Sequence, residues 1–381
     1  MTRILYLVTE DWYFCSHRLP LARAAKQAGY EIIVVTQAGN HADIIRNEGF
    51  KFISVIFPRS MKRPWQDIRT LYSIFKIYRQ EHPDVVHHVA LKPVLYGSLI
   101  AIFTMRKSSC LIINALTGLG FVFTSTRESV GLLRSLVKFF LRFILRSNNS
   151  YLILQNSDDA QMLIENNIVD RARVSIIRGS GVDIQVFKPN PQTGNELIIM
   201  LIARMLKDKG VEEFVIAASQ LKSQGINARF VLVGGADQEN PSAIPVKKLN
   251  QWDSEGSIEW WGKRDDMVEV YKQANIVVLP SYREGLPKVL LEAAACGLPI
   301  VTTDVPGCRE IVINEKNGLL VPAKNAQALA KAINRLINSP ELCKQMGEKG
   351  REMVEKEFSL DKVVGETLDL YKYLLDKQHF Q

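Results

Sequence analysis

The feature that most constrains this chain is a long alternation of short apolar runs with helical stretches. Residues 3–9 and 31–36 are rich in β-branched and other apolar side chains, and residues 19–28 between them have a helical pattern that ends at Gly29. Strand, helix and strand within about 35 residues form a βαβ unit, whose two strands are parallel. The alternation continues through further strand-like runs at residues 52–57, 85–89, 111–114, 151–155 and 174–177.

A second series of the same kind follows a change of composition. Residues 187–195 are rich in Pro, Asn and Gly, which is typical of a linker. Beyond it, strand-like runs occur at residues 197–202, 230–233, 258–260, 276–279 and 300–302. The length of 381 residues also exceeds one core of about 100–200 residues. We therefore predict an α/β protein with two Rossmann-like domains facing across a cleft. The predicted parts are an N-terminal domain at 1–186, a linker at 187–195, a C-terminal domain at 196–358 and a C-terminal helix at 359–381 that packs back on the N-terminal domain.

Composition narrows the class of protein. Apolar residues make up 47% of the chain and charged residues 23%, which is typical of a globular protein and excludes general disorder. The apolar run Val94–Met105 is too short to cross a bilayer, and no signal-peptide pattern precedes Ile4, so we expect neither a transmembrane helix nor a secretory signal. Five widely spaced cysteines indicate reduced thiols in the cytoplasm. The net charge of +8 favours an anionic partner: a nucleotide, a phospholipid surface or nucleic acid.

The segment 279–297 carries the first candidate site. A strand ends at Leu279, Pro287 suits the first turn of a helix, and Gly297 suits its end. The free amides of such a first turn bind anions. Glu284 lies in the loop, and in a regular helix Glu292 would lie about 12 Å further along the axis. That spacing suits an elongated ligand with hydroxyl-rich ends and a diphosphate between them. A capped surface helix with two solvated glutamates is the alternative.

Two other loops follow strands in the same half of the chain. Arg204 and Lys209 follow the run 197–202, where they could clamp phosphate oxygens. Gly234 and Gly235 follow the run 230–233, where glycine allows the backbone to approach a ligand closely. Read alone, each loop is also compatible with an ordinary strand-to-helix connection.

Together these elements resemble the retaining family 4 glycosyltransferases, which have the GT-B fold. The resemblance extends over nearly the whole chain. It rests on Glu284 with Glu292, on the loop with Arg204 and Lys209, on Gly179–Asp183 followed by Phe187 and Pro189, and on Thr303–Glu310.

The resemblance implies a role for each matching residue. Arg204 and Lys209 would hold the donor diphosphate, and Glu284 would face the hydroxyls of the donor sugar; these three form the predicted catalytic group. Glu292 would bind the ribose hydroxyls. The remaining predicted donor contacts are Gly234, Gly235, Gly285 and Leu286.

The amino-acid sequences of two segments are similar to those of bacterial enzymes that extend a polyprenyl-diphosphate-linked sugar. These segments are Met200–Arg204 with Lys209–Val211, and Val231–Gly235 with Glu239–Ser242. The similarity implies an N-acetylhexosamine donor, UDP-GalNAc or UDP-GlcNAc, ahead of a plain hexose. It also implies a polyprenyl-diphosphate-linked saccharide as the acceptor.

The acceptor is expected on loops after the N-terminal strands. We interpret the segment from Trp12 to Arg18 as the first such loop, where aromatic rings could pack on a sugar or lipid and Arg18 could meet a phosphate. Tyr13 and Phe14 could instead pack in the core. The predicted acceptor contacts are Ser16, His17, Arg18, Lys92, Asn114, Thr117 and Gly118.

The sequence does not identify a catalytic base. His87 and His88 end a strand-like run, and histidines in buried strands are more often structural. Many relatives have a histidine in the loop occupied here by residues 114–120, whereas this chain has Asn114 and Thr117. Retention in the family is usually discussed as attack on the front face, with the departing phosphate taking the acceptor proton, so a charged clamp matters more than a base.

A basic stripe suggests contact with a membrane. Arg134, Lys138, Arg142 and Arg146 recur every four residues among Leu, Phe, Val and Ile, which favours a helix lying in the headgroup region of an anionic bilayer. Arg59, Lys62 and Arg63 near Trp65 could extend this surface. We therefore predict a peripheral protein on the inner face of the cell membrane. The alternative is an amphipathic helix buried against the sheet.

Other classes remain as alternatives. A UDP-sugar 2-epimerase of GT-B fold would bind UDP without needing a lipid acceptor. A glycosyltransferase could also use a hexose donor or a non-lipid acceptor. A nucleic-acid binder predicts aromatic and basic residues interleaved on one sheet face, and no such arrangement is present, so we expect no nucleic-acid partner. Without an Asp-x-Asp element we expect no metal and no cofactor, since Arg204 and Lys209 could replace the charge of a metal.

Overall fold

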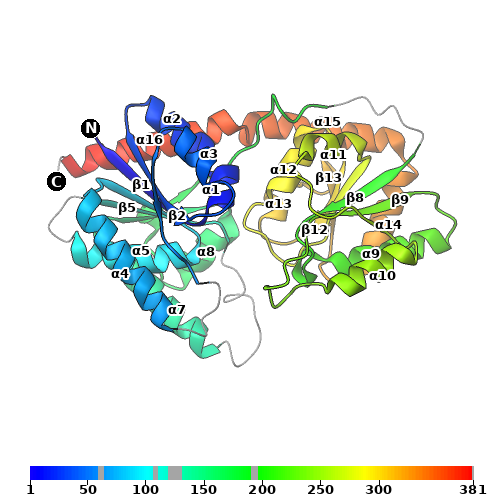
Figure 1. The fold of residues 1–381 in the computed structure, drawn as a ribbon. Helices are drawn as coiled ribbons and strands as arrows, with labels where there is room; N and C mark the ends of the chain where they lie inside the picture. The colour runs from blue at the N-terminus through cyan, green and yellow to red at the C-terminus, as the bar shows by residue number, and fades with distance from the viewer. Residues whose placement is uncertain (59–63, 106–109, 119–130, 190–195, 380–381) are drawn as a thin grey trace. The chain divides into compact units, whose positions relative to one another are not determined.

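The chain forms two compact units (Figure 1). Unit 1 holds Met1–Ser180 together with Val363–Gln381, and unit 2 holds Gly181–Lys362. The computed structural model describes residues 1–58, 64–105, 110–118, 131–189 and 196–379. Of the predicted linker, residues 187–189 are described and belong to unit 2, whereas 190–195 lie outside the described residues.

Unit 1 is built on a parallel sheet. Within the described residues its order is β3-β2-β1-β4-β5-β6-β7. The strands β2 and β3 therefore lie on one side of β1, and β4 to β7 lie on the other. Every pair of neighbouring strands is parallel, as the βαβ pattern predicts. The strands are β1 Arg3–Glu10, β2 Glu31–Gln37, β3 Lys51–Ser54, β4 Val85–Val89, β5 Leu111–Leu116, β6 Ser150–Leu154 and β7 Val174–Ile176.

Helices cover both faces of this sheet (Figure 1). The apolar side chains of α4, α5 and α7 pack on one face, and those of α1, α2, α3 and α16 pack on the other. The bounds are α1 Asp11–His17, α2 Leu19–Gln27, α3 Ala42–Asn47, α4 Pro64–Glu81, α5 Leu91–Thr104, α7 Gly131–Leu145, α8 Ser157–Glu165, the 3-10 helix η2 Arg171–Arg173 and α16 Leu360–His379.

Unit 2 repeats the architecture with a parallel sheet of order β10-β9-β8-β11-β12-β13. Its strands are β8 Ile198–Ile202, β9 Arg229–Val233, β10 Glu259–Trp260, β11 Ile276–Leu279, β12 Ile300–Thr303 and β13 Gly318–Val321. Its helices are the 3-10 helix η3 Lys207–Lys209, α9 Val211–Ser223, α10 Val246–Ser254, α11 Met267–Gln273, α12 Lys288–Ala295, α13 Cys308–Ile311, α14 Ala326–Ile337 and α15 Pro340–Glu357.

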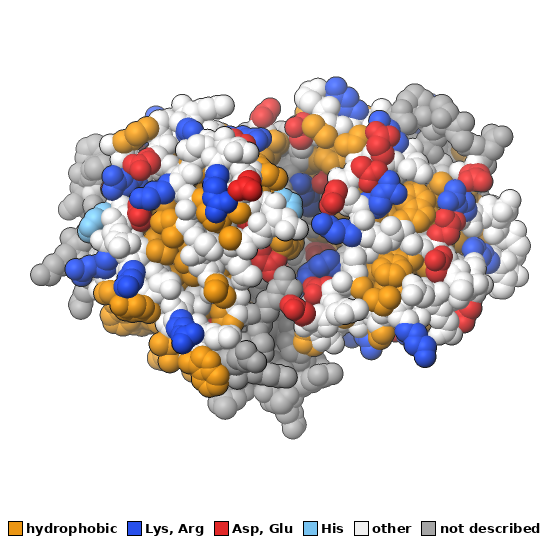
Figure 2. Space-filling model, viewed as in Figure 1, with side chains coloured by type: hydrophobic (Ala, Val, Ile, Leu, Met, Phe, Trp, Pro, Cys, Tyr) orange, Lys and Arg blue, Asp and Glu red, His pale blue; other side chains and the backbone are white. Residues whose placement is uncertain are grey.

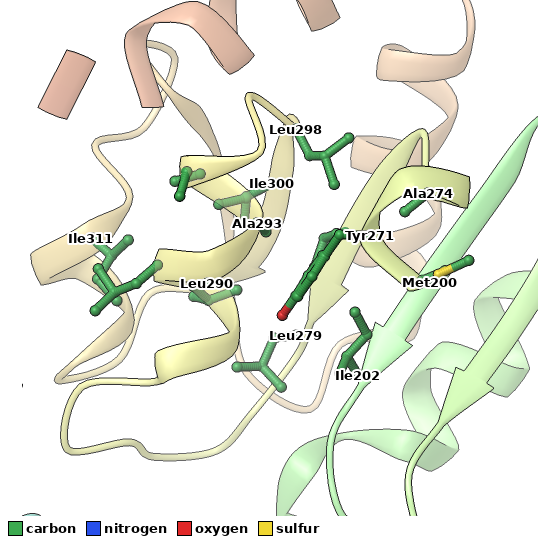
Figure 3. Packing of buried hydrophobic residues seen from close by; sticks show 14 of the residues in the cluster. Met200, Ile202, Tyr271, Ala274, Leu279, Leu290, Ala293, Leu298, Ile300 and Ile311 are labelled. Atoms are coloured by element: carbon green, nitrogen blue, oxygen red, sulfur yellow. The ribbon is translucent and has the colours of Figure 1, made fainter. Parts of the chain in front are cut away.

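Strands buried on both faces explain why the sequence shows continuous apolar runs. All five residues of β8 and all four of β11 are buried, which is the rule for parallel sheets covered by helices. On one face the ring of Tyr271, from α11, lies among Met200 and Ile202 of β8, Leu279 of β11 and Leu290 of α12 (Figure 3). This packing fixes α12 against the carboxyl end of β11.

Two elements differ from the sequence interpretation. The segment from Trp12 to His17 is not a loop but belongs to α1, because burial of Phe14 against Tyr6 outweighs the weak helix propensity of its aromatic residues. The strand β13 was not predicted, since its four-residue run Gly318–Val321 is short and begins with glycine.

Candidate functional site

The loops after β8 and β11 meet at the centre of the unit 2 sheet. These strands are neighbours in the sheet although two other strands separate them in sequence. Such a switch point opens a crevice at the carboxyl ends of the strands, where open α/β sheets bind ligands. Lys209 from the first loop donates a hydrogen bond to the Oε1 atom of Glu284 in the second. Their side chains are only 20% and 11% exposed, so this ion pair is largely buried between the two loops.

Backbone contacts hold the two loops together. Gly210 has φ +72°, and a Cβ atom there would lie 2.2 Å from the carbonyl oxygen of Pro280, so this position requires glycine. The amide of Tyr282 and the hydroxyl of Ser281 both donate to the carbonyl of Asp208, at 2.9 and 3.0 Å. The position of Lys209 relative to Glu284 is therefore set by the main chain.

The loop after β12 closes a third side. The hydroxyl of Thr303 donates to the carbonyl of Ser281, and the amide of Glu284 donates to the carbonyl of Pro306 at 3.3 Å. A Cβ atom on Gly307 would lie 2.5 Å from the carbonyl oxygen of Gly285, so these loops pack backbone to backbone. The predicted donor contacts Gly285 and Leu286 thus lie in a segment that is held from both sides.

The loop after β9 contacts Arg204, which lies in the loop after β8. The Nη1 atom of Arg204 donates to Asp237 at 2.9 Å, and the Arg204 side chain is 55% exposed. Gly234 has φ +149°, and a Cβ atom there would lie 1.8 Å from the carbonyl oxygen of Ala203. Around Gly235 a Cβ atom would meet only the Lys263 side chain, at 3.5 Å. Gly234 is thus needed for packing between loops, whereas a Cβ atom at Gly235 would make only an ordinary van der Waals contact.

Glu292 occupies a different environment from Glu284. It lies on α12, is 7% exposed, and its Oε2 atom accepts a hydrogen bond of 3.0 Å from the hydroxyl of Tyr271. Its other carboxylate oxygen lies 3.5 Å from Nζ of Lys288. Burial raises the pKa of the Glu292 carboxyl, and the charge of Lys288 opposes this shift. Tyr271 lies 21 positions earlier in the sequence, and no pattern in the sequence indicated this partner.

The helix α12 itself begins one residue later than predicted. Pro287 has φ −72° and ψ 111°, so it caps the helix and does not form part of its first turn. The helical path therefore starts at Lys288, and Glu284 lies in an irregular loop. The 12 Å separation of the two glutamates, which assumed a regular helix from Glu284 onward, does not apply.

In unit 1 the predicted acceptor residues fall into three environments. Ser16 and His17 end α1: the Ser16 hydroxyl lies 2.6 Å from Nδ1 of His17, whose ring stacks on Tyr13 at 4.2 Å. Ser16 is exposed and His17 half-buried, so both face the surface. Thr117 and Gly118 follow β5 and are half-buried.

Arg18 belongs to a second environment, a buried polar cavity. The cavity has room for about one water molecule. Polar residues that line it include Arg18, His87, Thr117 and Gln155. The Nε atom of Arg18 and the Nε2 atom of His87 are buried there without a hydrogen-bond partner among the described residues. Burial, and then the charge of Arg18, hold the pKa of His87 well below its usual range, so this imidazole is neutral at neutral pH.

The third environment is a set of polar side chains that already have hydrogen-bond or ion-pair partners within unit 1. Asn114 is fully buried; its Oδ1 atom lies 2.7 Å from the Ser98 hydroxyl and 3.0 Å from Nδ1 of His88, and its amide donates to Ser150 at 3.0 Å. A contact between Asn114 and an acceptor would require these bonds to open. Lys92 donates to the carbonyl of Pro58 and lies 3.2 Å from Asp67.

Comparisons with known proteins agree with this architecture. The model described as glycosyl transferases group 1 matches residues 183–353, and the model described as glycosyl transferase 4-like matches residues 3–156. Together the two models account for most of both units. The chain belongs to the group 1 glycosyltransferases. This is a family of retaining hexosyl and hexosaminyl transferases, so the predicted enzyme class is confirmed.

Individual group 1 relatives support the same family. The chain is 29% identical over 338 residues, or 85% of its length and 86% of the relative, to the N,N'-diacetylbacillosaminyl-diphospho-undecaprenol α-1,3-N-acetylgalactosaminyltransferase of Campylobacter jejuni. It is 26% identical over 320 residues, or 80% of its length and 79% of the relative, to the UDP-Gal:α-D-GlcNAc-diphosphoundecaprenol α-1,3-galactosyltransferase of Escherichia coli.

Solved structures show the fold of this group 1 enzyme. The sucrose-phosphate synthase of Thermosynechococcus elongatus superposes with a TM-score of 0.81 at 20% identity, covering 99% of this chain and 100% of the other. The prediction of a GT-B fold with two Rossmann-like α/β domains is therefore confirmed.

The predicted membrane helix of this glycosyltransferase is α7. Leu141, Ile144 and Leu145 are buried against the sheet, whereas Arg142 and Arg146 are exposed. Lys138 is half-buried and lies 3.4 Å from Asn166, and Arg146 pairs with Asp170 at 3.1 Å. The side chain of Arg134, together with Arg59, Lys62 and Arg63, lies outside the described residues.

Two further findings concern membranes and metals. No helix within the described part of the chain is long and apolar enough to cross a membrane. In the same residues no group of three or more His, Cys, Asp or Glu side chains is placed to hold a metal ion.

Proposed function

We propose that this enzyme transfers GalNAc or GlcNAc from its UDP donor to a polyprenyl-diphosphate-linked saccharide during cell-surface glycan assembly. The observation that carries the donor half is the Lys209–Glu284 pair at the switch point, beside the first turn of α12. A cation and a carboxylate side by side at the carboxyl ends of the strands match the phosphates and hydroxyls of a nucleotide sugar. The acceptor half is supported by the names of the two relatives from Campylobacter jejuni and Escherichia coli.

Each donor-site residue takes a defined part in this proposal. Lys209 and Arg204 exchange their partners Glu284 and Asp237 for oxygens of the diphosphate, so both cations stay paired when the donor binds. Glu284, released from Lys209, accepts hydrogen bonds from hydroxyls of the donor sugar. Glu292 accepts them from the ribose.

The remaining donor contacts in the proposal come from the main chain. The backbones of Gly285 and Leu286 approach the phosphates beside the start of α12. Gly234 keeps the loop after β9 against Ala203, and the lack of a side chain at Gly235 allows the nucleotide to lie close to the backbone.

The transfer step follows from the charges in this crevice. An acceptor hydroxyl oxygen forms a bond to C1 of the sugar on the face from which UDP departs, and the bond between C1 and the phosphate oxygen breaks. The acceptor proton moves to the departing diphosphate, whose developing charge is stabilised by Arg204 and Lys209. The configuration at C1 is retained, and the step needs neither a protein base nor a metal.

The acceptor is proposed to lie on unit 1, where Ser16, His17, Thr117 and Gly118 reach the surface. In this proposal the side chains of Arg18, Lys92 and Asn114 lie beneath that surface. We also propose that α7 places the enzyme on the inner face of the cell membrane, where a lipid-linked acceptor would be found. The family argues against a UDP-sugar 2-epimerase, which would use a similar UDP site without any acceptor.

A panel of donors tests the proposal. The purified enzyme is incubated with UDP-GalNAc, UDP-GlcNAc, UDP-Gal, UDP-Glc and GDP-mannose, each with and without a polyprenyl-diphosphate-linked sugar, and release of nucleoside diphosphate is followed. We expect release that depends on the acceptor and is fastest with one UDP-N-acetylhexosamine. Conversion of UDP-GlcNAc without an acceptor would favour the epimerase, and release from UDP-Gal or UDP-Glc alone would replace the donor assignment.

Variants test the residue assignments within the same panel. Glu284→Ala is expected to lower turnover, and Glu292→Ala is expected mainly to raise the Kd for the donor. Glu348→Ala, an exposed glutamate on α15, is the matched control and should behave like the unmodified enzyme. Unchanged kinetics in both site variants would reject the donor-site assignment.

A further inference from the structure

The helix α4 presents apolar side chains to solvent along one face. Trp65, Ile68, Tyr72 and Phe75 are 60%, 65%, 57% and 37% exposed. Their spacing of three, four and three residues places them in one stripe on the helix. The opposite side of α4 is already buried in the core through Ile74, Ile77 and Tyr78. The exposed stripe is therefore a second apolar face that the fold of unit 1 does not use.

The helix α7 has the same two-sided character. Its inner residues are buried against the sheet, whereas Leu136, Phe139, Phe140 and Phe143 are 52%, 65%, 36% and 47% exposed. Both α4 and α7 pack against α5, whose Phe103 is 68% exposed. In Figure 2 apolar side chains gather over the lower part of unit 1, where Figure 1 shows α4 and α7. We call these exposed residues of α4, α5 and α7 the outer aromatic face.

Basic residues accompany the outer aromatic face. The segment 51–150, which contains all three helices, has 15 Lys and Arg residues against 4 Asp and Glu, a net charge of +11 compared with +8 for the whole chain. Two of these four acids have basic partners: Asp67 lies 3.2 Å from Lys92, and Glu81 lies 2.6 Å from Lys51. Exposed basic residues on the helices include Arg69, Lys76, Arg79 and Arg142.

We propose that α4 and α7 together form the surface on which this enzyme docks to an anionic lipid bilayer. Aromatic and aliphatic side chains beside arginines and lysines match the boundary between headgroups and acyl chains. Each basic side chain near an anionic surface adds attraction, so the exposed Arg69, Lys76, Arg79 and Arg142 on these helices favour an anionic bilayer. This inference rests on the membrane part of the proposed function and extends it from one helix to two. Two helices on either side of α5 would fix how unit 1 is oriented on the membrane, which one helix would not.

The test compares three sets of substitutions on the full chain. The first is Ile68→Ser with Tyr72→Ser and Phe75→Ser on α4, and the second is Phe139→Ser with Phe143→Ser on α7. The control is Ile216→Ser with Tyr373→Ser, two side chains that are 56% and 61% exposed on α9 and α16. Because all of these side chains point to solvent, we expect each variant to unfold at nearly the same temperature as the unmodified enzyme.

Binding is measured by sedimentation with vesicles of phosphatidylglycerol and phosphatidylcholine. Both helix variants are expected to bind about tenfold more weakly or worse, while the control binds as the unmodified enzyme does. The fluorescence of Trp65, taken as the difference from Trp65→Phe, should be quenched by brominated lipid, because a merely electrostatic contact would leave this ring in water. The Kd for UDP should be the same in all variants, which separates docking from the donor site.

Three results would overturn the inference. Vesicle binding by the α4 variant equal to that of the unmodified enzyme, with loss only in the α7 variant, would leave a single docking helix. No binding of the unmodified enzyme to anionic vesicles, or binding to duplex nucleic acid in their place, would reject a lipid partner. Failure of the donor panel with vesicle binding intact would instead reject the proposed transfer reaction and leave the docking surface standing.

Discussion

Replacing Glu292 by glutamine should weaken UDP binding without weakening the fold. The carboxylate is buried in unit 2, and its polar neighbours are the hydroxyl of Tyr271 at 3.0 Å and Nζ of Lys288 at 3.5 Å. Glutamine has nearly the same shape, and its carbonyl oxygen can still accept the bond from Tyr271. The substitution therefore removes the negative charge and one strong acceptor and leaves the packing of α12 unchanged.

The size of the effect on binding follows from the lost acceptor. A hydrogen bond to a charged group contributes about 2 kcal/mol more than no bond, so the Kd for UDP should rise by roughly 30-fold.

The effect on the stability of the fold has the opposite sign. Burial raises the pKa of Glu292 above its ordinary value of 4.5, so the folded enzyme binds this proton more tightly than the unfolded chain does. Its contribution to stability is therefore present at acid pH and is lost as the pH rises through the raised pKa.

Calorimetric titration with UDP and thermal unfolding between pH 4 and pH 8 measure both effects. Relative to the unmodified enzyme, Glu292→Gln should gain stability as the pH rises, while its affinity for UDP falls. Tyr271→Phe is the matched control, since it removes the partner hydroxyl but keeps the carboxylate. A variant with unchanged UDP affinity and lower stability at pH 8 would refute the reasoning and make Glu292 a structural partner of Tyr271.

Three further predictions concern the supports of the site. Gly210→Ala should cost at least about 2 kcal/mol of stability and lower turnover, because φ is +72° and the new Cβ atom would lie 2.2 Å from the carbonyl oxygen of Pro280. Thermal melting and steady-state kinetics measure both effects. Gly225→Ala is the control for backbone strain alone, because nothing lies within 4 Å of a Cβ atom at that position. Burial lowers the pKa of His88 to about 4 from 6.5, so the enzyme should lose about 3 kcal/mol of stability as the pH falls through this range, and His88→Gln should flatten that pH profile of thermal unfolding. Arg351→Leu should lower the melting temperature of unit 2, because its guanidinium donates to three backbone carbonyls at 2.7 to 3.0 Å, and an unchanged melting curve would contradict this role.

The fold was largely predictable because parallel strands buried on both faces leave continuous apolar runs in the sequence. The runs at residues 85–89 and 276–279 match β4 and β11 without any shift. The short helix α1 was not predicted because its residues have weak helix propensity, and tertiary contacts such as the burial of Phe14 stabilise it. The strand β13 was not predicted because its run of strand-like residues is only four residues long.

The candidate site was predictable only in part. The sequence places Lys209 and Glu284 in loops after strands, and the order of strands in the sheet brings those loops together. Their polar neighbours were not predictable, because Asp237 and Tyr271 contact Arg204 and Glu292 from other strand–helix units. Nor could spacing alone show that Arg18 and Asn114 point into the interior.

The return of α16 to unit 1 affects how the enzyme can fold during its synthesis. Val363, Tyr371 and Leu374 fill part of the unit 1 core, and the hydroxyl of Tyr371 lies 3.3 Å from that of Tyr6 and contacts His87. A ribosome makes these residues after all of unit 2. Until then one face of the first sheet lacks its covering helix, whereas unit 2 is a continuous segment that can fold as soon as it emerges. Nascent unit 1 thus exposes apolar surface throughout the synthesis of unit 2, and this surface can associate with other chains until α16 covers it.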